Sequence, residues 1–380
     1  MGALAGRARG GRGRGAERGA GGAALTGGKA PGGGRGRRAR VTLRQIADEV
    51  GTSQSTASRA LAGHGYVAPE LKARIEEAAA RLGYVPDISA RTLKGHSSGL
   101  IGLLVSDLRN QFYAQLAAGV EQTVAAAGHQ VVLVDDHGDE AEAVRGAKAF
   151  LAMRAAGVLL APVGREATDL LVGHGTPVVE VDRRSGARGC DAVIIDSESG
   201  AREAVGHLLA LGHRRIAVVV DETVWDTGRN RLKGYRAAHR AAGVPLARRL
   251  VLDLGLHPED PRRDVAAFLD ANPDVTAVFA ANNVMAEAVW QELKRRGAAV
   301  PGRCSMVSFD DLTWMRVVEP GLTAVRQPVY EMGHRAAQLL IERVDGGHGR
   351  PETRTLRPEL VLRGSTAAPA CAPGADVGTS

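Results

Sequence analysis

The sequence has few aromatic residues, few cysteines and no long apolar run. Only 3% of its residues are aromatic, and its three cysteines, at positions 190, 304 and 371, show no CxxC spacing. A scattered, odd-numbered set argues against both a disulfide framework and a zinc site. No apolar stretch approaches the roughly 18 residues of a membrane span, and none follows the N-terminal arginines as a signal peptide would require. We therefore expect a cytoplasmic protein with no membrane partner.

The sequence also lacks the short motifs of common enzyme classes. It has no GxGxxG after a predicted strand, no P-loop and no GxSxG, and its acidic residues form no evident metal cluster. His207, His213 and His334 lie on or beside helix patterns and are interpreted as structural. Asp310 and Asp311 could form a carboxylate pair, but chain neighbours usually point apart. The prediction is a protein without catalytic residues, metal or cofactor.

Positive charge is concentrated at the N-terminus. Residues 1–40 hold nine Arg, one Lys and one acid, whereas the whole chain of 380 residues carries a net charge of +7. The remaining residues are therefore slightly acidic overall and do not form a basic body. Residues 1–40 consist mainly of Gly, Ala and Arg, with little to bury, so we expect a disordered arm. It either adds salt-sensitive phosphate contacts or is a dispensable extension.

Residues 42–61, TLRQIADEVGTSQSTASRAL, predict two short helices joined by a tight turn. Thr42 and Gln45 have capping-box spacing, Gly51 suits the turn, and Ser53 can cap the second helix. Apolar residues fall on one face of each helix. They are Leu43, Ile46, Ala47 and Val50 in the first helix and Ala57, Ala60 and Leu61 in the second.

The opposite face of the second helix is polar and basic. It carries Gln54, Ser55, Ser58 and Arg59. In a DNA major groove, Gln can pair with adenine and Arg with guanine. An ordinary helical hairpin with a solvated face is the alternative, and DNA binding is the favoured interpretation.

A third helix is predicted along Leu71, Ile75, Ala78, Ala79 and Leu82. A proline precedes it at position 69, where the first turn tolerates one, and a glycine ends it at position 83. Together the three helices predict a small all-α domain over residues 41–86.

Residues 87–98 are predicted to link this domain to the rest of the chain. Ile88 to Lys94 could form one or two helical turns, but only if a partner stabilises them. Leu93 is the one large apolar side chain there that could insert into a minor groove. A plain linker is the alternative.

From residue 100 the pattern changes to short β-branched runs that alternate with amphipathic helices. Strands are predicted near residues 100, 130, 157, 177, 192, 215, 248, 275, 305 and 322. Helices are predicted near 112–127, 139–155, 199–211, 229–242, 261–271 and 283–296. This alternation predicts an α/β fold whose parallel sheets are covered by helices on both faces. Two such series imply two lobes.

Polar side chains stand just beyond the ends of several predicted strands. They are Asp107, Asn110, Asp182, Arg183, Asn282, Asp310 and Gln327. Ligands of open parallel sheets bind beyond the carboxyl ends of the strands, so we predict one binding cleft rather than scattered helix caps. Carboxylate, amide and guanidinium groups can bond neighbouring hydroxyls, and Phe112 and Tyr113 offer the flat apolar surface on which a sugar ring packs. A sugar is the predicted ligand.

Taken together, residues 41–365 resemble the lactose-repressor family of bacterial transcription regulators. The motifs that carry the resemblance follow in matching order and spacing: VTLRQIADEVGTSQSTASRAL, LGYVPD, ARTLKG, IGLLVSDLRNQFY, VVEVDRR, HLLALGHRRIAVV, RLKGY, TAVFAANN, SFDD and TAVRQPVYEMG. The resemblance implies a helix-turn-helix domain, a hinge and a two-lobed periplasmic-binding-protein-like domain of the ribose-binding type. It also implies a homodimer that reads a roughly palindromic operator in double-stranded DNA.

The resemblance assigns the DNA contacts by position. Gln54 and Ser55 match the residues that mainly set base preference, and Leu93 matches the hinge leucine that wedges into the minor groove. The implied DNA-binding set is Thr42, Ser53, Gln54, Ser55, Thr56, Ser58, Arg59, Ala90, Leu93 and Lys94.

The resemblance assigns the sugar site in the same way. The implied set is Asn110, Phe112, Tyr113, Asp182, Arg183, Arg231, Asn282, Asp310 and Gln327. Three positions depart from the family pattern. Gln111 replaces a usual proline, and Leu254 stands where an aromatic wall residue is common. Asn283 replaces a usual aspartate, although Asn can cap the next helix equally well.

We expect a sugar-responsive DNA-binding repressor. Its lobes are predicted at residues 99–197 with 328–356 and at 198–327 with 357–365, followed by a disordered tail without coiled-coil heptads. Sugar bound between the lobes would change their angle and so the affinity for DNA. The alternatives are a purine or nucleoside effector, a sugar receptor without a DNA function, and a sugar-modifying enzyme.

Overall fold

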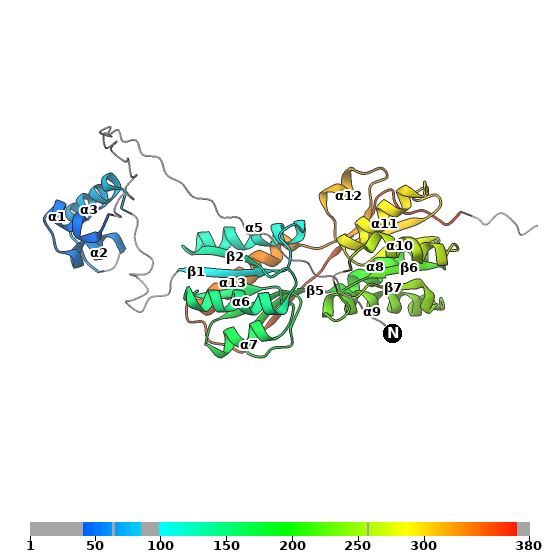
Figure 1. The fold of residues 1–380 in the computed structure, drawn as a ribbon, viewed down its shortest axis with the longest axis horizontal. Helices are drawn as coiled ribbons and strands as arrows, with labels where there is room; N and C mark the ends of the chain where they lie inside the picture. The colour runs from blue at the N-terminus through cyan, green and yellow to red at the C-terminus, as the bar shows by residue number, and fades with distance from the viewer. Residues whose placement is uncertain (1–40, 63–64, 85–98, 257, 371–380) are drawn as a thin grey trace, which may run out of the picture. The chain divides into compact units, whose positions relative to one another are not determined.

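The computed structural model describes residues 41–62, 65–84, 99–256 and 258–370. Its contacts divide the chain into two compact units, Met1–Pro86 and Asp87–Ser380 (Figure 1). The predicted N-terminal arm and the predicted hinge, with Ala90, Leu93 and Lys94, lie outside the described residues. No helix in the described part is long and apolar enough to cross a membrane.

The first unit is a helical domain formed by α1 (Leu43–Val50), α2 (Gln54–Ala62) and α3 (Pro69–Leu82). The predicted capping box begins α1: Thr42 Oγ1 accepts the amide of Gln45, and Gln45 Oε1 accepts the amide of Thr42 at 2.8 Å. Gly51 then ends α1 with a φ of 74°, a left-handed conformation that favours glycine. Ser53 Oγ accepts the amide of Thr56 at 3.1 Å, which caps α2 as predicted.

The core of this domain takes one buried face from each helix. Ile46, Ala57 and Ile75 are completely buried, and Ala47, Ala60 and Ala78 are nearly so. The larger predicted core residues at the rim are partly buried against them: Leu43, Leu61, Leu71 and Leu82. Burying an Ile or Leu side chain contributes about 1.5–3 kcal/mol to the stability of the fold. The apolar seam formed by these buried faces therefore determines which face of α2 points outward.

The second unit contains two sheets. The first has the order β11-β5-β4-β3-β1-β2, and the second has the order β12-β10-β9-β8-β6-β7. The strands of the first sheet are β1 (Leu100–Val105), β2 (Gln130–Asp135), β3 (Gly157–Leu160), β4 (Val178–Asp182), β5 (Asp191–Ile195) and β11 (Thr353–Leu356). Those of the second are β6 (Ile216–Val220), β7 (Val251–Asp253), β8 (Ala277–Ala280), β9 (Ser305–Phe309), β10 (Thr323–Arg326) and β12 (Glu359–Val361). All pairs are parallel except β10 with β12.

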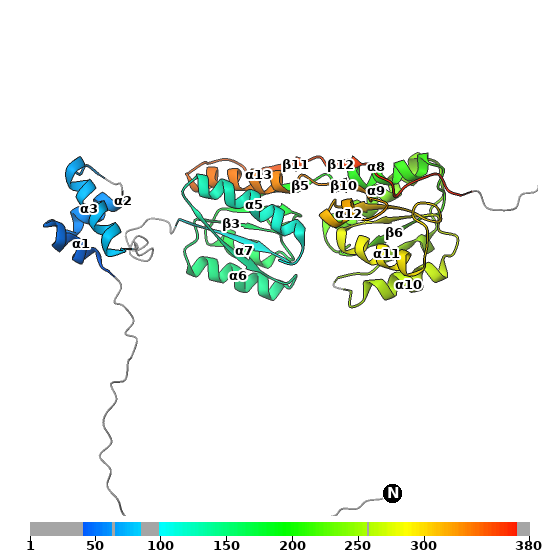
Figure 2. The same cartoon turned by 90° about the horizontal axis from the view of Figure 1, so that it is seen from above.

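Helices cover both faces of each sheet (Figure 2). The first sheet lies between α5 (Gln111–Ala126) with α13 (Val329–Val344) and α6 (Glu140–Ala152) with α7 (Glu166–Gly173). The second lies between α8 (Ser197–Ala210) with α9 (Asp226–Ala241) and α10 (Pro261–Ala271) with α11 (Asn283–Arg295). Two short helices, η1 (Arg248–Leu250) and α12 (Thr313–Val317), complete the second lobe. The predicted fold class is confirmed.

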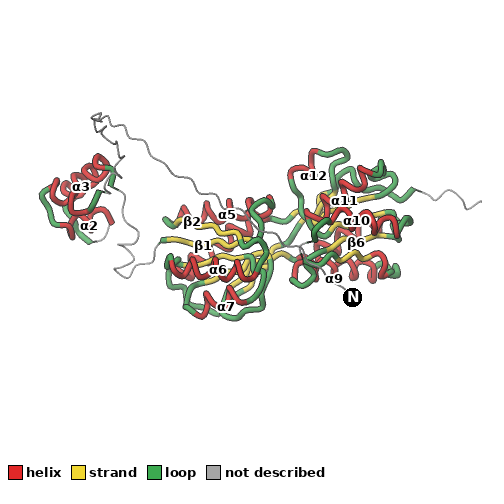
Figure 3. The backbone as a smooth tube through the Cα atoms, viewed as in Figure 1, coloured by secondary structure: helices red, strands yellow, loops and turns green. Residues whose placement is uncertain are grey.

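Some elements were absent from the sequence prediction: α7, α12, α13, β11 and β12. The last two strands are short and no residue in them is fully buried, so they lack the run of buried apolar residues that marks most of the other strands. They matter for the architecture because the chain crosses between the lobes after β5, after β10 and after β11. Figure 3 shows the strands at the centre of each lobe with the helices outside them.

The first lobe depends on a close approach of α5 and α13. A Cβ atom on Gly119 would lie 2.1 Å from the carbonyl oxygen of Tyr330, and one on Gly333 would lie 2.2 Å from that of Leu116. Only glycine allows the two backbones to meet at these points. The two helices therefore pack backbone to backbone, with α5 against β1 and β2 and α13 against β3 and β4.

The three histidines interpreted as structural all bond to neighbouring segments. His334 Nδ1 lies 2.6 Å from Thr123 Oγ1, and His213 lies 2.9 Å from both Thr276 Oγ1 and the carbonyl oxygen of Ala367. His207 Nε2 lies 3.0 Å from Thr366 Oγ1. The described chain thus packs on the second lobe past the boundary expected at residue 365.

Candidate functional site

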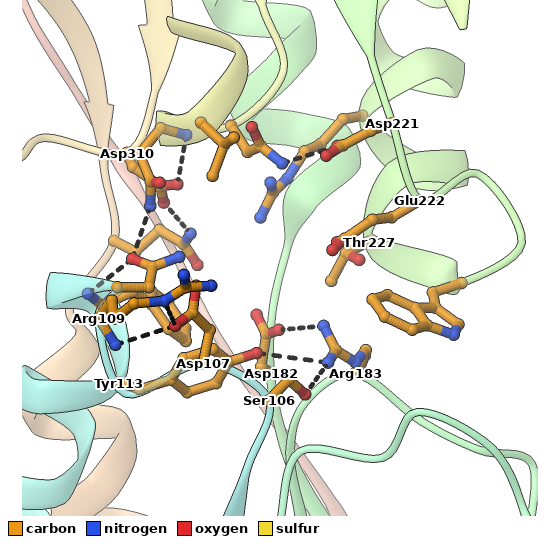
Figure 4. Close-up of a pocket in the computed structure, with 18 of the residues that line it drawn as sticks. Ser106, Asp107, Arg109, Tyr113, Asp182, Arg183, Asp221, Glu222, Thr227 and Asp310 are labelled. Carbon is orange, nitrogen blue, oxygen red and sulfur yellow. Dashed lines mark hydrogen bonds and ion pairs between the residues drawn. The ribbon is translucent and has the colours of Figure 1, made fainter. Parts of the chain in front are cut away.

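A cavity of about 350 Å³ lies between the two lobes, beyond the carboxyl ends of the strands (Figure 4). Every residue of the predicted sugar set lines it: Asn110, Phe112, Tyr113, Asp182, Arg183, Arg231, Asn282, Asp310 and Gln327. The size is within the usual range for small-molecule sites. Residues almost 220 positions apart in the sequence are thus brought to one place.

Asp107, which the sequence placed at the predicted cleft beyond a strand end, also lines the cavity. The other residues of the cavity wall were not predicted: Ser106, Arg109, His137, Asp221, Glu222, Trp225, Thr227, Pro258, Pro261, Asn283 and Val284. Asp221 directly follows β6. The search for polar residues at the carboxyl ends of strands, which selected Asp182, could therefore have found it. Trp225 lies in a loop before α9, where the sequence carries no comparable signal.

Several wall residues have a left-handed backbone. Asp182 and Asp310 have φ angles of 69° and 77°, and Glu222 and His137 both have φ of 53°. Such conformations are uncommon for residues other than glycine and cost on the order of 1–3 kcal/mol each. They persist only where the surrounding structure over-determines them, and they concentrate at functional sites.

Arg183 is fixed by bonds within the first lobe. Its Nε donates to the carbonyl oxygen of Pro162 at 2.7 Å, and its Nη2 donates to Ser106 Oγ at 2.8 Å and to the Tyr113 hydroxyl at 3.3 Å. Its Nη1 lies 3.4 Å from Asp182 Oδ2. Figure 4 shows Ser106, Tyr113, Asp182 and Arg183 gathered along one edge of the cavity.

Arg231 approaches the cavity from α9 in the second lobe. Its Nη1 donates to the carbonyl oxygen of Ala281 at 2.8 Å, and its guanidinium lies 4.0 Å from the centre of the Phe309 ring. Its Nε is buried without a protein partner, as are Gln327 Oε1 and Thr227 Oγ1. Buried polar atoms normally have a hydrogen-bond partner, and all three atoms belong to residues that line the cavity.

Asp310 and Asn282 begin a second group of polar contacts. Asp310 Oδ2 accepts the amide of Asn283 at 3.0 Å, and Gln327 Nε2 donates to Asp310 Oδ1. Asn282 Nδ2 donates to Asp221 Oδ1 at 2.7 Å. Each carboxylate keeps further acceptor sites for a ligand.

Asn283 does not cap the following helix, which corrects the expectation from the sequence. Asn282 is the cap of α11, because its Oδ1 accepts the amide of Met285 at 2.8 Å. Asn283 is the first helical residue, and its Nδ2 instead donates to Asn110 Oδ1 in the other lobe at 3.0 Å. The Asn side chain therefore joins the lobes.

The structure also shows where the other two residues that depart from the family pattern lie, Leu254 and Gln111. Leu254 packs with the core of the second lobe and is absent from the cavity wall. Trp225 supplies an aromatic ring to that wall, and Phe112 and Tyr113 contact each other edge to face with centroids 5.1 Å apart. Gln111 donates through Nε2 to Thr313 Oγ1 at 2.9 Å, again between the lobes.

Burial shifts the acidity of the wall residues. Burial raises the pKa of Asp182 to about 6, although Arg183 and Arg231 oppose the shift. Burial also raises the pKa of Asp221 to about 6 against the hydrogen bond from Asn282, and raises that of Tyr113 to about 12. Tyr113 therefore stays a neutral hydroxyl at physiological pH.

Asp311 points away from its neighbour, as chain neighbours usually do. Its side chain is buried among Arg316, Arg326 and Arg363, with Arg363 Nη2 at 2.8 Å. Burial would raise the pKa of Asp311, but hydrogen bonds from Arg363 and Arg326 outweigh it and lower the pKa. Asp310 and Asp311 therefore do not form a carboxylate pair. Within the described residues, no group of His, Cys, Asp and Glu has the geometry of a metal site.

The outward face of α2 carries the candidate DNA contacts. Gln54, Ser55 and Arg59 are exposed, as are Thr42 and Ser53, whereas Thr56 and Ser58 are half-buried. Arg59 Nε lies 3.4 Å from the carbonyl oxygen of Ser55, so its side chain folds back along its own helix. Hydrogen bonds join Ser53, Ser55, Thr56 and Arg59 at the start and along one side of α2, whereas Thr42 lies at the start of α1.

Tyr66 is a further candidate at this surface that sequence reasoning missed. Its side chain is 87% exposed, which is unusual for an aromatic residue. It follows Gly65, where an added Cβ would lie 3.6 Å from the side chain of Arg59. The loop after α2 therefore lies beside the basic end of the helix.

Comparison with known families and proteins gives consistent matches. The family described as bacterial regulatory proteins, lacI family, matches residues 42–87, and the periplasmic binding protein-like domain matches residues 205–366. The HTH-type transcriptional regulator CelR of Thermobifida fusca is 34% identical over 340 residues, which cover 87% of this chain and 99% of that protein.

Two solved structures are similar in fold and sequence. A complex of the transcriptional regulator CelR with cellobiose has a TM-score of 0.66 at 31% identity, covering 86% of this chain and 100% of that chain. A LacI family regulator from Enterococcus faecium with bound ribose has a TM-score of 0.62 at 26% identity, covering 71% of this chain and 99% of that chain.

Proposed function

Because this chain belongs to the lacI family of bacterial regulatory proteins, we propose that it is a cytoplasmic repressor whose operator affinity is controlled by a small sugar. We assign DNA binding to residues 41–86 with the hinge at 87–98, and sugar binding to residues 99–365. The observation that carries the proposal is the cavity between the lobes, which all the residues of the predicted sugar set line.

The chemistry of the cavity favours an uncharged sugar, a ribose-like pentose or a hexose. Its wall contains more carboxylates than guanidinium groups: Asp107, Asp182, Asp221, Glu222 and Asp310 against Arg109, Arg183 and Arg231. Two of the arginines are already bonded to acids, Arg109 to Asp107 at 2.9 Å and Arg183 to Asp182 at 3.4 Å. A phosphorylated or acidic sugar would therefore meet repulsion, whereas neutral hydroxyl groups find both donors and acceptors.

On the DNA side, we propose that α2 enters the major groove. Gln54 and Arg59 are exposed on its outer face, where they can reach adenine and guanine edges. Thr42 and Ser53 stand at the N-termini of α1 and α2, where backbone amides favour phosphate oxygens.

We further propose a homodimer on a palindromic operator. In the second lobe, Val317 at the C-terminal end of α12 is 74% exposed. The C-terminal end of α11 lies next to it, because Lys294 Nζ donates to the carbonyl oxygen of Glu319 at 3.3 Å. An exposed apolar side chain where two helix ends meet fits a protein interface.

The mechanism we propose is linkage between two binding sites. A sugar that contacts both lobes favours one angle between them, and the dimer transmits that angle to the segment that joins the lobes to the DNA-binding domain. The relatives are transcriptional regulators, so we assign the cavity to ligand sensing rather than catalysis. Unaltered recovery of the bound sugar is the corresponding check.

The test combines a ligand screen with DNA binding. Thermal unfolding of the full chain is measured with D-ribose, hexoses, cellobiose and nucleosides, since a ligand at 100 times its Kd stabilises by about 2.7 kcal/mol. The preferred duplex is selected from random DNA, and its affinity is then measured with and without the stabilising compound. A sugar that raises the melting temperature and changes operator affinity supports the proposal.

Other outcomes would count against separate parts of it. A nucleoside as the sole hit would replace the sugar, and a chain that prefers no duplex over scrambled DNA would remove the repressor assignment. A sugar that is chemically altered after incubation would point to an enzyme.

A further inference from the structure

The lobes contact each other directly on both sides of the cavity. On one side, Gln111 bonds Thr313 at 2.9 Å and Asn283 bonds Asn110 at 3.0 Å. On the other side, the first lobe meets the residues that begin α9. The indole Nε1 of Trp225 donates to the carbonyl oxygen of Val163 at 3.2 Å.

On this second side of the cavity, two consecutive residues of the first lobe contact two consecutive residues of the second lobe. The Arg183 guanidinium lies over the Trp225 ring, 3.9 Å from its centroid. The next residues also pair, because the amide of Arg184 donates to Asp226 Oδ2 at 3.1 Å. Arg183 and Arg184 follow β4 in the first lobe, whereas Trp225 and Asp226 belong to the second lobe.

Arg183 needs this contact to complete its surroundings. Its guanidinium donates hydrogen bonds within the first lobe to Pro162, Asp182, Ser106 and Tyr113, and Glu222 of the second lobe also attracts its charge. These bonds lie at the edge of the planar group and leave its faces to be covered. Trp225 covers one face from the other lobe, and the electron-rich face of an indole attracts a cation more strongly where water is excluded.

The same loop of the first lobe holds both partners. Arg183 Nε donates to the carbonyl oxygen of Pro162, and Trp225 Nε1 donates to that of Val163, the next residue. The stacked pair is therefore anchored at two consecutive carbonyls. The pair cannot separate without breaking the indole hydrogen bond between the lobes.

Trp225 also connects to cavity residues of the second lobe through the helix that follows it. Trp225 is the residue before α9, and α9 carries Thr227 and Arg231 into the cavity wall. The start of α9 lies close to β6, because an added Cβ on Gly228 would lie 2.5 Å from the carbonyl oxygen of Asp221. A movement at Trp225 therefore moves the helix that presents Arg231.

We propose that Trp225 is a positioning residue of the sugar site, which closes the second lobe on Arg183 and makes sugar affinity depend on lobe closure. The inference rests on the proposed function only for the identity of the ligand. The closing contact itself requires no ligand, so it can be tested with the protein alone.

The first experiment measures the distance between the lobes without sugar. Spin labels are attached to Lys148→Cys on α6 and Arg262→Cys on α10, both exposed, in a Cys371→Ser background. Cys190 and Cys304 are buried and remain unlabelled. We expect Trp225→Leu to lengthen and broaden the distance distribution, and Trp225→Phe, which keeps a ring face but loses the hydrogen bond, to lie between Leu and wild type.

The matched control is Trp290→Phe. Trp290 is 8% exposed in the core of the second lobe and does not line the cavity. This substitution should leave the distance distribution unchanged. If Trp225→Leu fails to fold, the comparison of Trp225→Phe with Trp290→Phe carries the test. A wild-type distribution in each Trp225 variant that folds would overturn the inference.

The second experiment asks whether Trp225 acts through Arg183. Binding of D-ribose and of cellobiose is measured for Trp225→Leu, Arg183→Lys and the double variant. We expect Trp225→Leu to weaken binding about 5- to 30-fold in the wild-type background and far less in the Arg183→Lys background. Equal losses in both backgrounds would show that Trp225 acts independently and would overturn the positioning role.

The two experiments separate the two proposals. If neither sugar binds the wild type but Trp225→Leu still changes the distance between the lobes, the closing role of Trp225 is supported and the proposed ligand is wrong. If sugar binds well and Trp225→Leu does not change that distance, the sugar site is supported and the closing role of Trp225 is wrong.

Discussion

At the scale of single residues, the cavity wall combines buried acids with strained backbone. Asp182 ends β4 and Asp310 directly follows β9, and both are buried and have a positive φ. Neither burial nor the left-handed backbone favours a charged carboxylate by itself. The arrangement is maintained by partners such as Arg183 and Gln327, which bond the two acids. These carboxylates are therefore placed for ligand contact at the expense of stability.

Asp182→Asn tests the burial of this acid through the pH dependence of stability. Because the pKa of Asp182 is about 6 when folded and about 3.9 when unfolded, the folded form binds its proton more tightly. The contribution of Asp182 to the free energy of unfolding is therefore full below about pH 4 and is lost as the pH rises through 6. Asn tolerates a positive φ and does not titrate.

Urea unfolding of both proteins between about pH 4 and pH 7 measures this contribution. We expect the stability of the wild type relative to Asp182→Asn to fall by about 2–3 kcal/mol as the pH rises over that range. A difference that does not vary with pH would mean that Asp182 titrates normally.

Arg231→Ala should remove the sugar response while leaving operator binding intact. Its Nη1 is bonded to Ala281, and its Nε is buried without a partner, so truncation removes a charged group from the wall of the proposed sugar site. Losing one partner of a buried charged contact costs about 2 kcal/mol or more, or at least a 30-fold loss of sugar affinity. Arg229→Ala, exposed on the same helix, is the control. An Arg231→Ala protein that sugar still releases from DNA would refute this role.

At the scale of elements, helix ends and glycines position the sites. The capping box of Thr42 and the left-handed Gly51 set the short α1, and the apolar seam turns the polar face of α2 outward. In the first lobe, Gly119 and Gly333 let α5 and α13 meet at their backbones. The side chains of α5 that face the cavity depend on that packing.

Arg59→Ala should weaken binding to the selected operator by about 1–3 kcal/mol, because a bidentate Arg–guanine contact of that strength would be lost. Fluorescence anisotropy with the selected duplex gives the affinity. Lys72→Ala is the matched control, since Lys72 is an exposed base on α3 whose salt bridge lies on its own helix. An unchanged affinity for Arg59→Ala would place the recognition surface elsewhere.

Gly119→Ala and Gly206→Ala should shift stability in opposite directions. At Gly119 the new Cβ would meet the Tyr330 carbonyl oxygen at 2.1 Å, and overpacking of this kind costs about 1–3 kcal/mol. At Gly206 in α8 nothing lies within 4 Å, so alanine should stabilise the helix by about 0.4–1 kcal/mol. Denaturant unfolding of the two variants decides this, and a Gly119→Ala protein as stable as wild type would mean that α5 and α13 can separate freely.

At the scale of the whole molecule, the second unit consists of two lobes, and the proposed mechanism requires the angle between them to change. Each lobe has its own sheet and its own helices, and the chain crosses between them at strands on one side of both sheets. The direct contacts between the lobes include hydrogen bonds, such as those of Gln111 with Thr313 and of Trp225 with Val163. Such contacts can break and re-form as the lobes change their angle.

Linkage predicts that sugar and operator change each other's affinity by the same factor. If the sugar weakens operator binding tenfold, saturating operator must weaken sugar binding tenfold. Calorimetric titration of sugar into the free protein and into the operator complex measures the second factor. A scrambled duplex at the same concentration is the control and should have no effect. Unequal factors would mean that sugar and operator do not act through one shared equilibrium.

Much of the fold was predictable from the sequence because it depends on local patterns. The strands at 100 and 305 and the helix at 261–271 follow directly from runs of β-branched residues and from helical periodicity. The sequence prediction missed β11 and β12 because both strands are short and neither contains a fully buried apolar residue. The search for polar residues at the carboxyl ends of strands identified Asp182 and Asp310 as cavity residues. It missed Trp225, because this residue lies in a loop where the sequence shows no helical or strand periodicity.

By itself, the sequence determined the elements, their caps, the outward face of α2 and the residue types that a sugar could use, since each of these depends on neighbours within a turn or a strand. Only the tertiary structure decided which side chains share the cavity and which pair across it. Asn283 illustrates the difference: its type suits a helix cap, yet its side chain bonds Asn110 in the other lobe at 3.0 Å. Contacts between lobes depend on how two sheets pack and cross, which local periodicity does not encode.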